Sequence, residues 1–284
     1  MKTVNVVCNE SLSKYTTIKI GGVAKKMYFP ESIDELKYVT TMSCENLVIG
    51  GGSNLLIANR EFDSVINMQK FDSRIINLGN GKYEVGASVR LQNLIKCINN
   101  DGYGGIEYLY SVPGLVGGAI VMNAGSGEMT KFCVGTMIES VKCLYKGKLI
   151  ELKREQCQFK HRDSIFKGDE YVVVSAIFHF ERVNKCISEK RREERIEFCK
   201  ATQDSSAPNF GSVFKYSNYR IMRIIQILSL GKKKGVHFSR KSGNWLLNSG
   251  DGEGFNDAKR LICFVKVIHK ILKKKCEVEV IIWE

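Results

Sequence analysis

The sequence predicts an α+β fold, in which groups of strands and separate helices follow one another along the chain. Apolar residues recur with helical spacing in a few well-separated segments, the clearest being residues 257–275. Between these segments, short strand-like runs succeed one another directly, with turn residues at their ends. Two of the runs break into glycines, but neither has the glycine spacing of a doubly wound nucleotide-binding fold.

The composition is that of a globular protein with more than one subdomain. The chain has 284 residues, 44% of them hydrophobic and 26% charged, which allows a sizeable core and two or three subdomains. The first residues contain no apolar segment followed by a small-residue cleavage site. The longest apolar runs fall far short of the roughly 20 residues that a membrane span needs. We expect a cytoplasmic protein with no membrane partner.

The cysteines show no pattern of metal ligands or of a disulfide framework. There is no C-x-x-C pair and no paired cysteine and histidine spacing. In a chain without a secretory signal, such cysteines are expected to be reduced, half-buried thiols, so we expect neither disulfides nor a metal site. The ten cysteines are at positions 8, 44, 97, 133, 143, 157, 186, 199, 263 and 276.

The net charge of +13 favours anionic partners. The excess is spread along the chain, with local clusters at 190–195, 232–234 and 273–275. The first cluster alternates with glutamates, which is typical of a solvated helix face. A lysine-rich surface is the simplest interpretation and attraction for phosphate-bearing small molecules the second. Nucleic acid is the weakest of the three, and we expect no nucleic-acid partner.

Residues 1–70 predict short strands and one helix. Tyr15–Ile20 and Lys26–Phe29 are strand-like, and the segment that starts at Glu31 has helical apolar spacing. Leu47–Ile57 then predicts a strand, a glycine turn and a second strand. These elements would form a β-α-β unit with the glycine turn at the end of a strand.

Residues 71–183 predict a second group of elements. Lys82–Ala87 is strand-like, and Val89–Asn99 is an amphipathic helix. A glycine-rich centre follows, and three consecutive strands are predicted at Met137–Tyr145, Lys148–Leu152 and Tyr171–Glu181.

Residues 184–284 predict a charged connecting helix and a smaller unit. The helix spans about 184–204, and the smaller unit begins near Ala207. Its clearest elements are the helix Asp257–Lys275 and a closing strand, Glu277–Trp283. Because side chains alternate along a strand, Glu277 and Glu279 are expected on the same face.

Two glycine-rich stretches organise the chain: Val48–Leu55 and Tyr108–Gly127. A strand that ends in glycines exposes successive backbone N–H groups, which form a concave anion site suited to a pyrophosphate. The third glycine of a G-x-G-x-x-G would fall on Leu55, and no P-loop motif is present. Either stretch alone could be a tight turn or a packing contact, but the two together favour a dinucleotide cradle.

The chain resembles the UDP-N-acetylenolpyruvoylglucosamine reductase family, in its shorter, second type. The matching segments follow the family's order and span nearly the whole chain. They are TTIKIGG (Thr16–Gly22), GGGSNLLI (Gly50–Ile57), VPGLVGGAIVMNAG (Val112–Gly125), RDSIFK (Arg162–Lys167), GSVFK (Gly211–Lys215) and EVEV (Glu277–Val280).

The resemblance implies an FAD-binding module of the vanillyl-alcohol-oxidase kind with two subdomains, 1–70 and 71–183. A C-terminal α+β substrate domain, 184–284, would follow. It also implies a monomer that acts on a sugar nucleotide, with bound FAD and with NADPH as the reductant that reduces FAD and leaves before the substrate enters the same pocket. The implied cofactor-binding residues are Gly50, Gly51, Gly52, Ser53, Asn54, Leu55, Pro113, Gly114, Val116, Gly117, Gly118, Asn123 and Gly125.

The implied reaction needs three protein groups. An enolpyruvyl ether is an electron-rich alkene, so hydride adds to C3 only if the attached carboxylate is polarised and C2 is then protonated. The resemblance makes Arg162 the clamp on the carboxylate, Ser212 the proton donor and Glu279 the group that stabilises the enolate. Read locally, the three would be a surface arginine paired with Asp163, a turn serine and the solvent face of an edge strand.

Other assignments depend on the resemblance more loosely. Lys215, Lys241 and Asn244 are implied substrate-binding residues, and Tyr15–Thr17 would lie near the flavin. The four histidines form no ligand set. The alternatives are a flavoprotein of the same fold with another substrate and a non-catalytic nucleotide-binding protein. Both are motivated by departures from the family pattern at His161, Tyr216, Ser217, Ser242, Cys276 and Trp283.

Overall fold

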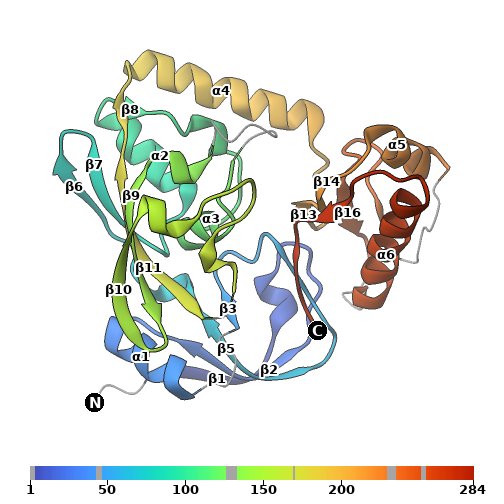
Figure 1. Ribbon diagram of the computed structural model, residues 1–284, viewed down its shortest axis with the longest axis horizontal. Coiled ribbons are helices and arrows are strands. Elements are labelled where there is room, and N and C mark those ends of the chain that lie inside the picture. The colour runs from blue at the N-terminus through green and yellow to red at the C-terminus, as the bar shows by residue number, and fades with distance from the viewer. Residues whose placement is uncertain (1–3, 43–46, 126–132, 169, 229–234, 251–253) are drawn as a thin grey trace. The chain divides into compact units, whose positions relative to one another are not determined.

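The computed structural model describes residues 4–42, 47–125, 133–168, 170–228, 235–250 and 254–284 (Figure 1). The chain forms two compact units. The larger unit comprises residues 1–8, 26–51 and 64–199, and the smaller unit comprises residues 9–25, 52–63 and 200–284. Cys44, the predicted lysine cluster at 232–234 and the last two residues of the stretch 108–127 lie outside the described residues.

The α+β class is confirmed by the order of elements. The helices are α1 (Ile33–Met42), α2 (Leu91–Asn100), α3 (Val116–Val121), α4 (Lys185–Thr202), α5 (Tyr219–Ile227) and α6 (Phe255–Ile271). The strands are β1 (Asn5–Ser11), β2 (Val23–Phe29), β3 (Val48–Ile49), β4 (Leu55–Ile57), β5 (Glu61–Asn67), β6 (Ile75–Gly79), β7 (Lys82–Gly86), β8 (Tyr103–Gly104), β9 (Ile138–Tyr145), β10 (Lys148–Lys153), β11 (Tyr171–His179), β12 (Glu181–Arg182), β13 (Asn209–Ser212), β14 (Phe214–Tyr216), β15 (Val236–Phe238), β16 (Trp245–Asn248), β17 (Glu277–Val278) and β18 (Ile281–Trp283).

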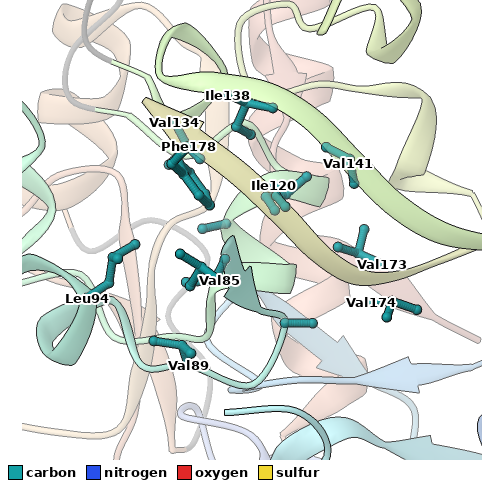
Figure 2. Packing of buried hydrophobic residues seen from close by; sticks show 14 of the residues in the cluster. Val85, Val89, Leu94, Ile120, Val134, Ile138, Val141, Val173, Val174 and Phe178 are labelled. Atoms are coloured by element: carbon teal, nitrogen blue, oxygen red, sulfur yellow. The ribbon is translucent and has the colours of Figure 1, made fainter. Parts of the chain in front are cut away.

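A five-stranded antiparallel sheet, in the order β10-β9-β11-β7-β6, forms the centre of the larger unit. Its buried side chains pack with those of α2 and α3, as Figure 2 shows for Val85, Leu94, Ile120, Val141 and Phe178. The amphipathic pattern of α2 explains its place, because its four apolar residues at helical spacing are all buried. The strands predicted between residues 137 and 181 are confirmed.

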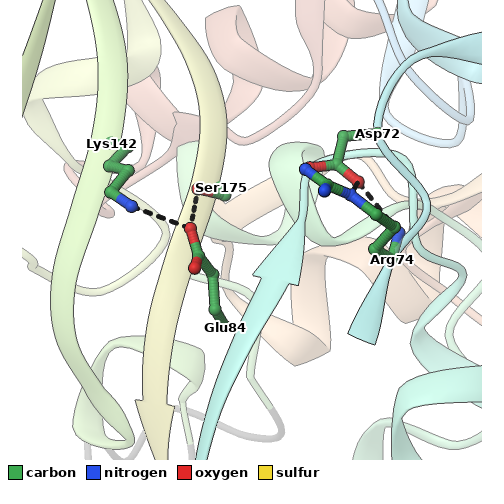
Figure 3. Close-up of polar contacts among 5 residues, drawn as sticks. All are labelled: Asp72, Arg74, Glu84, Lys142 and Ser175. Carbon is green, nitrogen blue, oxygen red and sulfur yellow. Dashed lines mark hydrogen bonds and ion pairs between the residues drawn. The ribbon is translucent and has the colours of Figure 1, made fainter. Parts of the chain in front are cut away.

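Polar side chains connect neighbouring strands of this sheet (Figure 3). Glu84 on β7 accepts a hydrogen bond from Lys142 on β9 (2.8 Å) and one from Ser175 on β11 (3.3 Å). The hydrogen bond to Glu84 raises the pKa of Lys142. Before β6, the Arg74 guanidinium donates two hydrogen bonds, of 2.9 and 3.0 Å, to the Asp72 carboxylate. Partial burial raises the pKa of Asp72, but the bonds from Arg74 outweigh it and leave that pKa lowered.

A four-stranded sheet has the order β1-β2-β5-β3, and β3 runs parallel to β5. The predicted strand, glycine turn and strand of residues 47–57 are confirmed as β3, a turn and β4. The division of the first 183 residues at residue 70 stays a prediction. None of the described helices is both long enough and apolar enough to cross a lipid bilayer.

The smaller unit combines three small sheets with α5 and α6. Their orders are β13-β16-β15, β14-β17 and β18-β4, the last pair being parallel. The predicted closing strand is interrupted, because β17 pairs with β14 whereas β18 pairs with β4. Glu279 and Val280 lie where the chain changes partner, so the premise that Glu277 and Glu279 share one face of a continuous strand is wrong.

The predicted strand Tyr15–Ile20 is also wrong. The segment Leu12–Tyr15 is a short 3-10 helix, and a tight turn follows it. Lys19 has φ 58°, the Lys19 N–H donates to the carbonyl of Thr16, and the Thr16 hydroxyl donates to the carbonyl of Ile20. Alternating side chains suggested a strand, but the buried threonine hydroxyl closes the backbone on itself.

Candidate active site

The two glycine turns of the larger unit meet backbone to backbone. A Cβ placed on Gly51 would lie 2.9 Å from the Cα of Gly114, closer than real Cβ atoms approach other atoms. Gly114 itself has φ 148°, and its carbonyl accepts a hydrogen bond from the N–H of Leu91. The carbonyl of Gly50 accepts from the side chain of Gln69 (3.0 Å). Only glycine allows the turns to approach so closely.

Asn67 adds a polar group beside this meeting point. It is fully buried at the end of β5 and pairs in register with Ile49, the residue before Gly50. Its Oδ1 accepts from the N–H of Gln69, while its buried Nδ2 has no hydrogen-bond partner among the described residues. Sequence reasoning missed Asn67, because nothing in its local pattern separates it from an ordinary strand end.

The turn at the start of α3 uses its glycines differently. The N–H groups of Val116 and Gly117 donate to the carbonyls of Val89 and Ala87, both at 2.8 Å. These two N–H groups therefore do not line an anion site, contrary to the simple cradle expected from the sequence. Gly118 is exposed, and a Cβ added to it would meet nothing within 4 Å. It leaves an opening on an otherwise mostly buried helix.

The turn that carries Arg162 is fastened to the end of α3. Asn123 is buried; its Oδ1 accepts from the N–H of Gly135 (2.9 Å), and its Nδ2 donates to the carbonyl of Lys160 (2.8 Å). The Ser164 hydroxyl donates to the carbonyl of Val121 (2.7 Å). Asn123 therefore joins the end of α3 to this turn through Nδ2 and to Gly135 through Oδ1. Gly125 forms a backbone bridge with Cys133.

Arg162 lies close to Tyr108, the first residue of the glycine-rich stretch. It has the left-handed backbone conformation (φ 53°), and its Nε is buried. Burial raises the pKa of Tyr108, and the positive charge of Arg162 opposes that rise. The structure thus brings this arginine to the glycine-rich stretch within the larger unit. Tyr108 lay inside a stretch that the sequence singled out, but its hydroxyl was given no role.

Ser212 and Glu279 come together in the smaller unit, where the chain passes from one small sheet to the next. Ser212 ends β13, which pairs with β16, and the next strand, β14, pairs with β17. The residue between them, Val213, is fully buried, and its carbonyl accepts the N–H of Glu279 (2.8 Å). The backbones of Ser212 and Glu279 are therefore held next to each other by a single buried residue.

The last residues of the Gly50–Leu55 loop reach the same place. Gly52 has φ 61°, and a Cβ there would fall on the carbonyl oxygen of Tyr15. Its own carbonyl accepts the N–H of Thr17 (3.0 Å), which places Tyr15–Thr17 against the loop. Ser53 follows, and Asn54 donates from Nδ2 to the carbonyl of Glu279 (3.4 Å).

The strand pairing extends this contact. Leu55 begins β4, and its partner in register is Ile281 of β18. The loop and the strand that follows it are thus joined to the carbonyl of Glu279 and to the strand that begins two residues later.

The predicted substrate-binding residues are engaged with the protein. Asn244 accepts at Oδ1 from the N–H of Phe214 (2.9 Å) and donates from Nδ2 to its carbonyl (2.7 Å), so it clamps the strand that follows Ser212. Lys215 forms an ion pair with Glu277 at 3.0 Å. Lys241 donates to the carbonyl of Lys200 (2.6 Å). A role in substrate binding stays a prediction for all three.

The loop before Asn244 is ordered by a buried serine that sequence reasoning missed. The Ser239 hydroxyl donates to Asp204 (2.5 Å) and accepts the N–H groups of Lys241 and Ser242. Burial raises the pKa of Asp204, but hydrogen bonds from Ser206 and Ser239 outweigh it and leave the pKa lowered. Among the described residues, no group of three or more potential ligands could hold a metal ion.

Known proteins of one family resemble the chain over nearly its whole length. A family described as the FAD binding domain matches residues 24–153. The chain is 31% identical to the UDP-N-acetylenolpyruvoylglucosamine reductase of Thermotoga sp. (strain RQ2), over 96% of this chain and 92% of that protein. It is 33% identical to the enzyme of that name from Carboxydothermus hydrogenoformans, over 98% and 92%. The chain belongs to the UDP-N-acetylenolpyruvoylglucosamine reductase family.

The fold of this family is also the fold of the chain. The crystal structure of the reductase from Thermus caldophilus superimposes with a TM-score of 0.80 at 25% identity and covers 99% of both chains. The residues present fit a bound FAD, because Gly51 and Gly114 of two turns meet, Gly118 leaves open space and the Nδ2 donor of Asn67 has no partner among the residues that the structure describes. The family resemblance and the flavin cofactor expected from the sequence are confirmed.

Proposed function

We propose that this protein reduces the enolpyruvyl ether of UDP-N-acetylglucosamine to UDP-N-acetylmuramate in the cytoplasm, as a monomer, with bound FAD and with NADPH as the reductant. Family membership supports the substrate class. The observation that carries the proposal is the junction at Val213, where the backbones of Ser212 and Glu279 are fastened together.

The residues that would hold FAD are those of the two glycine turns, Gly50–Leu55 and Pro113–Gly118, with Asn123 and Gly125 supporting the second turn. Bound FAD would supply the two-electron chemistry, accepting hydride from the nicotinamide and passing it to the alkene. The protein's own task is to place the alkene, polarise its carboxylate and supply a proton.

Arg162 would polarise the substrate carboxylate. A guanidinium is always charged and can form two parallel hydrogen bonds to a carboxylate, which favours the charge that develops when the alkene accepts hydride. Its turn is anchored by Asn123 and Ser164, so the charge has a fixed position in the larger unit. A preorganised charge stabilises a transition state better than one that must move into place.

Ser212 would protonate C2 of the substrate, and Glu279 would stabilise the enolate. A serine hydroxyl is a weak acid, so it donates a proton only to a strongly basic carbon such as an enolate carbon. A carboxyl group near the substrate carboxylate has a raised pKa and can share in the protonation. The buried carbonyl of Val213 and the side chain of Asn54 hold the backbone on both sides of Glu279.

The test separates reduction of the flavin by NADPH from its reoxidation by the substrate. Purified protein is first reduced, and its reoxidation by the enolpyruvyl sugar nucleotide is followed by flavin absorbance. Ser212→Ala should bind FAD and be reduced by NADPH like the wild type but reoxidise at least about a hundredfold more slowly. Unchanged reoxidation in Ser212→Ala would remove the assigned role, and no reoxidation in the wild type would remove the proposed reaction.

One observation favours a second candidate, a flavoprotein of this fold with another electron acceptor. Lys215 is paired with Glu277, and Lys275 places its Nζ 3.6 Å from the ring centre of Tyr216. Tyr216, beside Lys215, departs from the family motif. Faster reoxidation by another acceptor than by the enolpyruvyl sugar nucleotide would support this candidate.

A further inference from the structure

The second half of α6, in the smaller unit, and the residues directly after it combine exposed apolar and basic side chains (Figure 1). The apolar members are Val267 (54% exposed), Ile271 (72%) and Leu272 (52%). We name this set the basic–apolar surface, together with its exposed basic members Lys266, Lys270, Lys273 and Lys274.

Val267 and Ile271 lie on the side of α6 that faces away from α5. Asn218, the N-cap of α5, donates its backbone N–H to Nε2 of the buried His269 in α6 (2.9 Å). The start of α5 therefore lies against the buried side of α6. The buried side of α6 carries Leu261, Ile262 and Val265 among others, so Val267 and Ile271 point the opposite way, toward solvent.

The surface is basic without compensating acids. Residues 200–284 contain 16 of the 43 basic residues of the chain but 7 of its 30 acidic residues, and residues 205–250 contain no aspartate or glutamate. The ion pairs between described residues do not include Lys266, Lys270, Lys273 or Lys274. The positive charge of this surface is therefore open to an external partner.

Stability of α6 alone does not explain the arrangement. Lysines at the end of a helix interact favourably with its dipole, which accounts for Lys270, Lys273 and Lys274. It does not account for Val267, Ile271 and Leu272, which expose large aliphatic side chains among these lysines. An exposed apolar cluster with a basic rim is typical of an interaction site.

We propose that the basic–apolar surface binds the headgroup region of an anionic lipid bilayer. Aliphatic side chains enter the acyl boundary and lysines meet lipid phosphates, so each residue type here has a place in that environment. A nucleic acid would satisfy the lysines but not Val267 or Ile271. A second copy of the surface would bring like charges together.

This inference revises the expectation of no membrane partner. The prediction from the sequence concerned spans and signal segments, whereas the surface depends on which side chains α6 leaves exposed. The binding is peripheral and does not depend on the flavin reaction. Each lysine near an anionic surface strengthens the binding by about fivefold, so several together with the apolar residues give measurable attachment.

The test is sedimentation of the full-length protein with vesicles of equal parts phosphatidylglycerol and phosphatidylcholine, and with vesicles of phosphatidylcholine alone. The protein should bind the anionic vesicles at physiological salt and bind the neutral ones at least about tenfold more weakly. Lys270→Gln with Ile271→Asn should lower binding by at least about tenfold. The variant Lys273→Gln with Lys274→Gln removes charge only. In high salt, where charges are screened, it should reduce vesicle binding less than Lys270→Gln with Ile271→Asn does.

The matched control is Lys148→Gln with Leu149→Asn on β10, which removes the same chemistry from another exposed place. It should bind like the wild type, and thermal melting should show all variants folded. The proposal is overturned by no binding to anionic vesicles, by equal loss in the control, or by duplex DNA binding that Ile271→Asn leaves unchanged. The last result would mark a nucleic-acid surface.

Discussion

The glycine turns of the larger unit and the Ser212–Glu279 junction of the smaller unit are fixed by opposite means. At Gly51 and Gly114 the geometry depends on missing side chains, because the backbones touch. At the junction it depends on side chains that are present, since Asn244 and Asn54 hold the strands by their amides. The first region should therefore fail when a methyl group is added and the second when an amide is removed.

The largest effect is expected from Gly52→Ala, at the residue where the first glycine turn enters the smaller unit. This change adds a left-handed backbone strain of about 1–2 kcal/mol and a clash with the carbonyl of Tyr15 that costs about as much again, so stability should fall by about 3 kcal/mol or more. FAD content should fall with it. Denaturant unfolding and flavin absorbance measure the two effects.

Gly79→Ala is the control for Gly52→Ala. Gly79 has φ 85° but nothing within 4 Å of an added Cβ, so only the backbone strain applies. Equal destabilisation by the two substitutions would show that the close packing at Gly52 contributes nothing.

Removal of the amide clamp should have the next largest effect. Asn244→Ala leaves the N–H and carbonyl of Phe214 without their partners, which should cost about 2–3 kcal/mol of unfolding free energy. Turnover should fall while FAD content stays, because the larger unit is untouched. Asn256→Ala, at an exposed position of α6, should be neutral. Loss of FAD in Asn244→Ala with normal turnover per flavin would contradict this division of roles.

Gly118→Ala tests whether the opening on α3 belongs to the cofactor. Alanine is better than glycine inside a helix, so the flavin-free protein should gain about 0.5–1 kcal/mol. The same methyl group would occupy space that FAD needs, so FAD should bind at least about tenfold more weakly. Titration of flavin-free protein with FAD measures the affinity. Unchanged or tighter binding would place the cofactor elsewhere, and a loss of stability without flavin would contradict the open space at Gly118.

The smallest expected effect is the loss of stability in Asp204→Asn, which removes a carboxylate that holds the loop before Asn244. This effect depends on pH. The lowered pKa of Asp204 means that its hydrogen bonds stabilise the fold above its ordinary pKa of 3.8 and that this stabilisation is lost as pH falls through the folded pKa. Asp204 is partly exposed, so Asp204→Asn should cost well under about 1 kcal/mol near neutral pH. The difference from wild type should shrink below about pH 4. A constant difference across pH would exclude a role for the carboxylate charge.

The sequence predicted most elements because their patterns are local. Helical spacing identified α2 and α6, and alternating or continuous apolar runs identified β7, β9 and β11. It failed at Glu279, where a continuous strand pattern is divided between two partner strands far apart in the chain. Strand partners are set by tertiary packing, which a local pattern does not contain.

The sequence predicted which motif residues belong to the candidate site, but not which residues surround them. The motifs located Ser212 and Glu279, and the structure places their backbones together. The surroundings of Lys215, Lys241 and Asn244 depend on contacts with distant segments, and no local pattern indicates them. Asn67 was invisible for the same reason, since burial of its amide follows from packing.

The pairing of β4 with β18 has a consequence for biosynthesis. Leu55, Leu56 and Ile57 are buried in the folded protein, and their partner is Ile281–Trp283. A ribosome makes residues 55–57 more than 200 residues before residues 281–283, so three apolar side chains lack their partner strand throughout that interval. The nascent chain should therefore depend on a holding chaperone at this strand until residues 281–283 have been made.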